Sequence, residues 1–300
     1  MIEMVIIPGP ASRGLGERIA RELGVKAHPV EHRVFPDGES YIRLTAPVEG
    51  ETAVIVQTTS ASPDTSLMQL FLMAATAVEL GAERVVCVVP YLAYARQDKR
   101  FLKGEALSLD AVLHLLDAAG ADDLIVVDAH NAESLRRAQG RYRIRVENLS
   151  AIPLLAKYLR ERGYSGAYSL SPDKGAIDLA RSGGKVLGGP SDFFVKRRDL
   201  RTGEIKMAVK DLDLRGRNAV VFDDIISSGG TMARAVAGLR ALGARQVAAA
   251  CTHGLFMGNA EKRIRDAGAD LIVSTDTVET RFSQVSVARL IAEKLKARGY

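Results

Sequence analysis

Two adjacent acids followed by a run of small hydroxyl residues lie in the last third of the chain, and these residue types suit sugars and phosphates. The apolar segment 219–222 predicts a buried strand that delivers Asp223 and Asp224 at its carboxyl end, where open α/β sheets bind ligands. Segment 227–231, Ser-Ser-Gly-Gly-Thr, then opens a predicted helix at 231–242. Backbone N–H groups at a helix N-terminus favour an anion, glycines let a phosphate approach, and hydroxyls add donors.

The two carboxylates restrict what this segment binds. They would repel a phosphate, so they must face hydrogen-bond donors or positive charge, and adjacent ribose hydroxyls with Mg²⁺ nearby meet that requirement. The alternative is a capped turn in which Asp223 and Asp224 accept hydrogen bonds from backbone N–H groups. The length of the run favours a sugar-phosphate site.

Three polar segments in the first half of the chain could bind a nucleotide. The acids of segment 35–39, Phe-Pro-Asp-Gly-Glu, can accept hydrogen bonds from an amine or from ribose hydroxyls, and Phe35 offers a ring face; Pro-Asp-Gly is also a good turn. The cationic segment 90–100 follows an apolar run and suits a polyphosphate, or it is a solvated basic turn. His130 lies just past the predicted strand 124–127 and is the best placed of the five histidines to be a ligand, although a lone histidine is more often structural.

Two segments of the second half carry further candidate residues. Segment 169–175 reads as a strand followed by a polar turn, in which Lys174 could supply a point charge. Segment 193–199 leads into the polar excursion 201–204 and contains a Lys-Arg-Arg run. Phosphoryl-type transfer depends mainly on in-line positioning and neutralised charge, which a cationic loop provides. The alternative for this segment is a surface hairpin whose edge is protected by Lys and Arg.

Apolar runs of strand length alternate with helical patterns along the whole chain, for example strands at 53–56, 85–89 and 124–127 and helices at 67–80 and 107–118. This alternation predicts parallel sheets covered by helices. The segments 53–90 and 219–254 share one plan, so we expect two similar α/β domains with a boundary near 145–150. The first copy has Gln-Thr-Thr where the second has Asp-Asp-Ile, so only the second is equipped for a sugar phosphate.

Composition excludes several classes of protein. The chain has 300 residues, 47% hydrophobic and 26% charged, with a net charge of +5 that suits anionic small molecules and an ordinary surface alike. No apolar run approaches the roughly 20 residues of a membrane span, and the N-terminus reads as a first strand, so we expect a cytoplasmic protein that binds no membrane. An aromatic content of 5% without a basic tract argues against nucleic-acid binding. Cys87 and Cys251 are expected in the core.

Segment 220–231 resembles the phosphoribosyl diphosphate motif shared by type I phosphoribosyltransferases and ribose-phosphate pyrophosphokinases. The other four segments resemble the pyrophosphokinase family, in the right order and over nearly the whole length. Ser227-Ser228, where Asp-Thr is common, looks like an archaeal-type branch. The resemblance implies an α/β fold of two phosphoribosyltransferase-like domains, each a mainly parallel sheet flanked by helices. Residues 1–147, joined by 283–300, would form the ATP side, and residues 148–282 the ribose 5-phosphate side.

The resemblance also implies the site residues. The ATP site would comprise Phe35, Asp37, Gly38, Glu39, Arg96, Gln97 and His130. The ribose 5-phosphate site would comprise Arg198, Asp223, Asp224, Ser227, Ser228, Gly229, Gly230 and Thr231. The pyrophosphate loop would be Asp173, Lys174 and Gly175, the metal residues His130 and Asp173, and the catalytic pair Lys196 and Arg198.

The implied reaction transfers the β,γ-diphosphoryl group of Mg²⁺-ATP to the C1 hydroxyl of ribose 5-phosphate, giving 5-phosphoribosyl 1-diphosphate and AMP. The implied assembly is a homo-oligomer, a dimer or higher. Two alternatives stay open at this point: a type I phosphoribosyltransferase, which uses no ATP, and a non-catalytic regulatory subunit.

Overall fold

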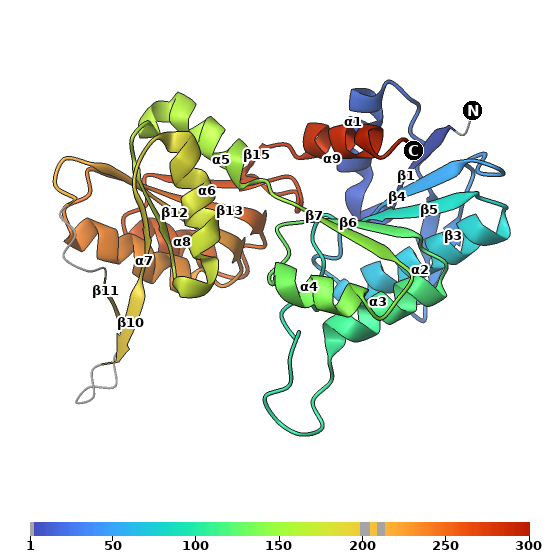
Figure 1. Ribbon diagram of the computed structural model, residues 1–300, viewed down its shortest axis with the longest axis horizontal. Helices are drawn as coiled ribbons and strands as arrows, with labels where there is room; N and C mark the ends of the chain where they lie inside the picture. The colour runs from blue at the N-terminus through green and yellow to red at the C-terminus, as the bar shows by residue number, and fades with distance from the viewer. Residues whose placement is uncertain (1–2, 199–204, 209–213) are drawn as a thin grey trace. The chain divides into compact units, whose positions relative to one another are not determined.

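The computed structural model describes residues 3–198, 205–208 and 214–300, which divide into two compact units. The first unit comprises Met1–Leu149 and Ser286–Tyr300, and the second comprises Ser150–Val285. In both units parallel sheets are covered by helices (Figure 1), so the predicted fold class is confirmed. No helix in the described ranges is both long and apolar enough to cross a bilayer.

The first unit is built on a five-stranded parallel sheet in the order β1-β4-β5-β6-β7. Its strands are β1 (Met4–Pro8), β4 (Thr52–Val56), β5 (Arg84–Val88), β6 (Asp123–Val127) and β7 (Arg145–Leu149). Its helices are α1 (Arg13–Leu23), α2 (Pro63–Glu79), α3 (Ser108–Ala118), α4 (Ala132–Gln139) and α9 (Ala288–Ala297). Helices α1 and α9 lie on one face of this sheet, and α2 and α3 on the other (Figure 1). A separate antiparallel hairpin is formed by β2 (Glu31–Val34) and β3 (Ser40–Arg43).

The second unit has a six-stranded parallel sheet in the order β15-β14-β13-β12-β8-β9. Its strands are β8 (Tyr168–Ser171), β9 (Ser191–Phe193), β12 (Asn218–Ile226), β13 (Gln246–Gly254), β14 (Leu271–Thr275) and β15 (Ser283–Val285). Its helices are α5 (Ile152–Leu159), which continues as one wider turn over Arg160–Tyr164, α6 (Ile177–Leu187), α7 (Gly230–Ala241) and α8 (Ala260–Asp266). An antiparallel ribbon of β10 (Val195–Arg198) and β11 (Ile205–Ala208) follows β9.

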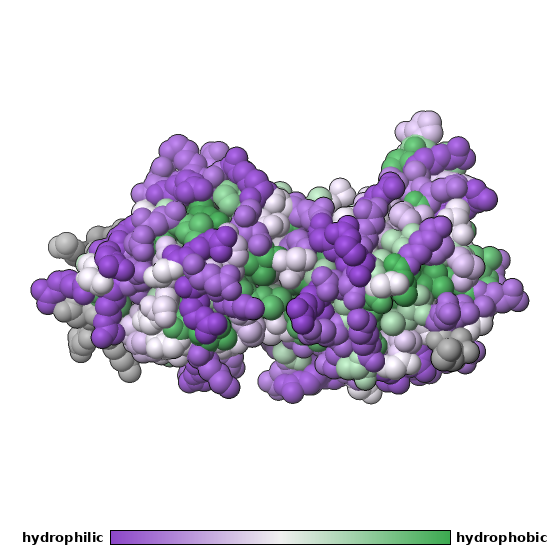
Figure 2. All heavy atoms as spheres, turned by 90° about the horizontal axis from the view of Figure 1, so that it is seen from above, coloured by the Kyte–Doolittle hydropathy of each residue, from purple (hydrophilic) through white to green (hydrophobic). Residues whose placement is uncertain are grey.

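Strand alternation explains how β12 joins two cores. Ala219 and Val221 pack into the core under α7 and α8, whereas Val220 and Phe222 pack into the core under α5 and α6. A parallel strand covered on both faces is apolar at every position, which is why 219–222 is a continuous apolar run. In the space-filling view hydrophilic residues cover most of the visible surface and hydrophobic ones appear in small patches (Figure 2), as expected when the apolar runs fill the cores.

The predicted end of this strand was wrong. The apolar run predicts a strand that ends at Phe222, but β12 continues to Ile226, because Asp223 pairs in register with Cys251 and Ile225 with His253 on β13. The two acids therefore lie within strand β12, near its carboxyl end, where its backbone still pairs with β13.

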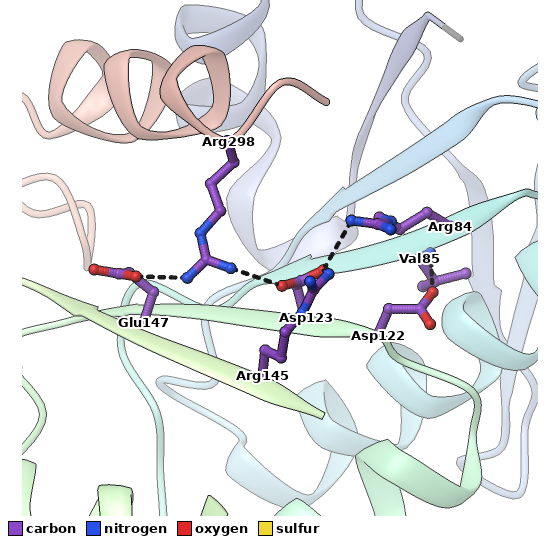
Figure 3. A network of polar contacts seen from close by, with 7 residues as sticks. All are labelled: Arg84, Val85, Asp122, Asp123, Arg145, Glu147 and Arg298. Atoms are coloured by element: carbon purple, nitrogen blue, oxygen red, sulfur yellow. Dashed lines mark hydrogen bonds and ion pairs between the residues drawn. The ribbon is translucent and has the colours of Figure 1, made fainter. Parts of the chain in front are cut away.

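The C-terminal segment is attached to the first unit by a buried ionic network. Asp123, 1% exposed, lies within 3.1 Å of Arg298 and 2.7 Å of Arg145, with Arg84 at 3.9 Å (Figure 3). Arg298 also pairs with Glu147 at 2.6 Å. These acids and arginines sit at or near the amino ends of β5, β6 and β7, the edge opposite to the one where parallel strands present ligand-binding loops. The network therefore stabilises the fold and docks α9.

Candidate active site

The two acids of β12 lie at the carboxyl edge of the second sheet in a crowded, partly buried environment. Asp223 accepts a hydrogen bond from the Asp224 N–H at 3.0 Å, and Asp224 accepts one from the Ile225 N–H at 2.9 Å. Burial raises the pKa of Asp223 well above its ordinary value, and the negative charges of Asp224 and Asp173 raise it further. The acids thus make the local backbone contacts of a capped turn, and together they concentrate negative charge at this edge.

The loop after β12 turns sharply into α7. Gly229 has a φ of +74°, a left-handed conformation that L side chains rarely adopt, and it occupies the N-cap of α7. A Cβ on Gly229 would also lie 2.9 Å from the Ala260 carbonyl oxygen, so both space and conformation require glycine. The N-terminal end of α7 is therefore accessible to a ligand that binds beside Ser227, Ser228, Gly230 and Thr231. The structure places all five predicted loop residues next to the two acids along one continuous strand–loop–helix segment.

The predicted pyrophosphate loop lies on the neighbouring strand. Strand β8 pairs with β12 and ends at Ser171, and a single 3₁₀ turn follows at Lys174–Ala176. The Asp173 carboxylate caps this turn by accepting a hydrogen bond from the Gly175 N–H at 3.0 Å. The charge of Asp173 reaches Asp223, because it contributes to the raised pKa of that carboxyl. The structure therefore brings the Asp173 turn and the Asp223–Asp224 pair to one edge.

The predicted catalytic pair lies on the β10–β11 ribbon. Lys196 pairs in register with Met207 and Arg198 with Ile205. The ribbon directly follows Phe194, which is 1% exposed and anchored in the core of the second unit. The polar excursion 201–204 lies outside the described residues.

In the first unit, the cationic segment and the histidine segment meet. The Asn131 side-chain amide donates to Asp98 Oδ2 at 2.7 Å, which joins the loop after β5 to the loop after β6. Burial opposes ionisation of Asp98, but hydrogen bonds from Ser134 and Asn131 and the charge of Lys99 outweigh it, and the pKa of Asp98 lies below its ordinary value. Residues 96–98 and His130 thus lie at the carboxyl edge of the first sheet, with Arg96 and Gln97 exposed.

The hairpin tip at 35–39 forms the tight turn that Pro-Asp-Gly favours. Phe35 N–H donates to the Glu39 carbonyl at 2.8 Å, and Gly38 has a φ of +96°. The Phe35 ring is 39% exposed and packs edge-on against Tyr41, with the Arg33 guanidinium 5.0 Å from its centre. These contacts stay inside the hairpin, and Phe35, Asp37 and Glu39 lie together at its exposed tip, while β3 packs on α2.

In the first unit, buried and hydrogen-bonded side chains occupy the position that corresponds to the loop after β12. Gln57 directly follows β4, at the position that corresponds to the Asp223 segment at the end of β12. Its side chain is fully buried. Its amide donates to Gln69 at 3.1 Å, and its oxygen accepts from the Ala11 N–H at 3.0 Å. The Thr58 N–H donates to Ser12 Oγ at 2.7 Å. The backbone and side chains here bind one another, so only the second unit keeps an open loop of this kind.

The carboxyl edge of the second unit fits a divalent cation. Within the described ranges, no group of three or more His, Cys, Asp or Glu side chains has the arrangement of a metal cluster. Mg²⁺ does not need one, because it is usually bound by one or two carboxylates, substrate phosphates and water. Burial raises the pKa of Asp223, and the negative charges of Asp224 and Asp173 raise it further; a cation at this edge would offset those charges. The predicted metal residues Asp173 and His130 lie in different units.

Several residues of these edges were not predicted as site residues. Asp98, Asn131 and Ser134 join the two loops of the first unit. In the second unit Arg263 Nη1 donates to the Ser228 carbonyl at 2.8 Å, and Arg234 Nη2 to Thr231 Oγ1 at 3.4 Å. Asp98 and Asn131 are 33 residues apart and Ser228 and Arg263 are 35 apart, so no local pattern in the sequence connects these two pairs.

The fold defines a protein of two phosphoribosyltransferase-type α/β units, of which the second has an open loop between β12 and α7. The family model for the N-terminal domain of ribose phosphate pyrophosphokinase matches residues 4–120, and the phosphoribosyl transferase domain model matches residues 148–289. With the relative described next, these matches show that the chain belongs to the ribose-phosphate pyrophosphokinase family.

Similar proteins cover nearly the whole chain. The ribose-phosphate pyrophosphokinase of Saccharolobus solfataricus is 38% identical over 276 residues, which cover 92% of this chain and 93% of the relative. That of Methanopyrus kandleri is 40% identical and covers 98% of this chain and 99% of its own. The crystal structure of phosphoribosylpyrophosphate synthetase from Mycobacterium smegmatis is 30% identical and superposes with a TM-score of 0.87 over 99% of both chains. The predicted resemblance, including its archaeal character, is confirmed.

Proposed function

We propose that this chain transfers the β,γ-diphosphoryl group of Mg²⁺-ATP to the C1 hydroxyl of ribose 5-phosphate, giving 5-phosphoribosyl 1-diphosphate and AMP. The observation that carries the proposal is the difference between the two units. The second keeps two acids and an open phosphate loop, whereas the first has filled the corresponding position with Gln57. The first unit instead presents a cationic loop beside His130, which suits a nucleotide polyphosphate.

In this reaction the second unit holds the sugar phosphate. The 5-phosphate accepts hydrogen bonds from the N–H groups and hydroxyls of segment 227–231, at the positive end of the α7 dipole. Asp223 and Asp224 accept hydrogen bonds from the ribose hydroxyls, which keeps the carboxylates away from the phosphate. The 3₁₀ turn of Asp173, Lys174 and Gly175 lies on the adjacent strand, where it would contact the transferred diphosphoryl group.

The bond changes balance without a further reactant. The C1 oxygen forms a bond to the β-phosphorus of ATP, the bond from that phosphorus to the oxygen bridging the α-phosphate breaks, and AMP leaves with the bridging oxygen. The hydroxyl proton is released. Lys196 and Arg198 offset the charge that develops in the transition state, which is the main contribution a protein makes to phosphoryl-type transfer.

The nucleotide is assigned to the first unit. Arg96 and Gln97 would contact the phosphates, and Phe35, Asp37, Gly38 and Glu39 the adenine and ribose. Mg²⁺ bound with ATP would offset phosphate charge; His130 in the first unit and Asp173 in the second unit are each a candidate metal contact. The family name of the relatives fits these substrates.

We further propose that the protein is a cytoplasmic homo-oligomer, a dimer or higher. Helix α2 exposes Met68 and Leu72, one helical turn apart, with 54% and 37% of each accessible. Helix α3, which packs on α2, exposes Leu115 at 49%. Exposed apolar side chains on two adjacent helices suit an interface with a second copy.

Incubation with ATP, Mg²⁺ and ribose 5-phosphate tests the proposed reaction. Formation of AMP that depends on the sugar phosphate is the expected result. Formation of ADP would indicate an ordinary kinase. Absence of nucleotide conversion would favour the phosphoribosyltransferase or the non-catalytic subunit instead.

A further inference from the structure

The backbone carbonyls at the start of the phosphate loop, those of residues 226–228, accept hydrogen bonds from a single segment of the chain, residues 255–263. The Ile226 carbonyl accepts hydrogen bonds from two backbone N–H groups of this segment, both at 3.0 Å. The Ser227 carbonyl accepts from a third at 3.0 Å. The Ser228 carbonyl accepts from the guanidinium of Arg263, Nη1 to O, at 2.8 Å. Three consecutive peptide groups are therefore fixed from the same side, and the last of them is fixed by a charged side chain.

This arrangement turns the other side of the loop outward. In a trans peptide the C=O and the following N–H point in opposite directions, and no peptide in the described residues is cis. The N–H groups of Ser227, Ser228 and Gly229 consequently point away from segment 255–263. In the part of the chain that the structure describes, none of these three N–H groups donates to a protein acceptor. Backbone donors need acceptors, and three that converge at a helix N-terminus suit the oxygens of one phosphate.

Two positive charges flank the same turn. A Cβ on Gly230 would lie 3.6 Å from Arg234 Nη1 and 3.8 Å from Arg263 Nη1. Arg234 reaches the turn from α7 and Arg263 from α8, and both side chains are otherwise exposed. Gly229 lies so close to the Ala260 backbone that a Cβ would not fit between the loop and α8. Arg263 therefore reaches the Ser228 carbonyl from a helix whose backbone packs directly on the loop.

We propose that Arg263 is a positioning residue of the ribose 5-phosphate site. Its bond to the Ser228 carbonyl fixes the peptide whose N–H, that of Gly229, faces the phosphate. Its charge, together with that of Arg234, favours a doubly charged 5-phosphate over an uncharged sugar terminus. This inference rests on the proposed function only in taking ribose 5-phosphate as the ligand of the loop.

Substitution at Arg263 separates a positioning role from a structural one. Arg263→Gln should raise the KM for ribose 5-phosphate on the order of tenfold or more, the usual effect of losing a hydrogen bond from a charged group. The KM for ATP should stay at the parental value. Arg263→Lys should recover part of the loss, because lysine restores the charge without the guanidinium geometry. Arg234→Gln should have a smaller effect, since it removes a charge and leaves the Ser228 carbonyl held.

Arg265→Gln is the matched control. Arg265 lies on the same helix, is exposed, and pairs with Glu261 at 3.1 Å away from the loop. This variant should keep parental kinetics for both substrates. Equal rises in both KM values in Arg263→Gln, or a rise of similar size in Arg265→Gln, would overturn the inference. Thermal melting of each variant checks that the fold is intact.

Calorimetric binding of ribose 5-phosphate without ATP distinguishes this inference from the proposed reaction. A parent protein that binds the sugar phosphate but forms no AMP contradicts the proposed function alone. An Arg263→Gln variant that binds with parental affinity contradicts the positioning role alone. A parent protein that does not bind ribose 5-phosphate overturns both.

Discussion

Replacement of Asp223 by Asn should stabilise the unliganded protein while removing its ability to bind ribose 5-phosphate. Burial raises the pKa of Asp223, and Asp224 and Asp173 raise it further, so ionisation of this carboxyl costs folding free energy. Asn removes the charge and keeps an oxygen that can accept the hydrogen bond from the Asp224 N–H. We therefore expect Asp223→Asn to raise the Tm of the unliganded protein at neutral pH, because the variant carries no charge at this buried position.

The sign of the pH dependence follows from the raised pKa. Well below the unfolded pKa of about 3.9 the carboxyl is protonated in both the folded and the unfolded chain, so the charge of Asp223 makes no difference between parent and variant there. As the pH rises, the unfolded chain releases its proton first, and the parent loses stability until the pH passes the raised pKa of the folded state. The advantage of Asp223→Asn should therefore be absent in acid and reach a plateau above that pKa.

Thermal unfolding in EDTA across pH 4 to 8, with Asp178→Asn as control, measures this effect. Asp178 is an exposed acid on α6 that forms an exposed ion pair with Arg181, so its neutralisation should change stability little at any pH. An Asp223→Asn variant that is less stable than the parent at pH 8, or whose advantage does not vary with pH, would refute the electrostatic reasoning. The variant should also bind ribose 5-phosphate far more weakly while it binds ATP as the parent does.

Three further outcomes follow from the structure. The double variant Lys196→Ala with Arg198→Ala should keep ATP binding and lose kcat on the order of 10³-fold; near-normal turnover would contradict the role of the ribbon. Arg298→Ala should lower the free energy of unfolding, measured in urea, by about 2 kcal/mol, because it removes the ion pairs that join the C-terminal segment to Asp123 and Glu147; a change under about 0.5 kcal/mol would count against that network. Burial raises the pKa of Cys87 to about 12 and that of Cys251 well above its ordinary value, so neither thiol should react with a disulfide reagent in the native protein at pH 8, and rapid labelling would show that the core opens.

The sequence predicted those features that depend on neighbouring residues. The alternation of apolar runs located β4 and α3 to within one residue at their ends, because burial on both faces of a parallel sheet leaves a local pattern. The Ser-Ser-Gly-Gly-Thr run predicted the turn into α7 for the same reason, since Gly229 is needed where the backbone becomes left-handed. The two-domain plan followed from the repeat of this pattern.

The features that the sequence could not predict depend on the packing of distant segments. Strand β12 extends four residues beyond the predicted end because β13 continues beside it, and nothing between Asp223 and Ile226 signals this pairing. The bond between Asp98 and Asn131 joins residues from two different strand ends. Likewise, Arg263 reaches the phosphate loop from a helix that begins about 30 residues after it, and only the fold brings the two together.

The fate of each phosphate of ATP tests the central claim most directly. In parallel reactions with ribose 5-phosphate and Mg²⁺, ATP labelled at the α-phosphate or at the γ-phosphate is followed by chromatography. We predict that the α-label appears in AMP and that the γ-label appears, in equal amount, in a sugar diphosphate. Appearance of the α-label in ADP with the γ-label in a ribose bisphosphate, or retention of both labels in ATP, would contradict the proposed function.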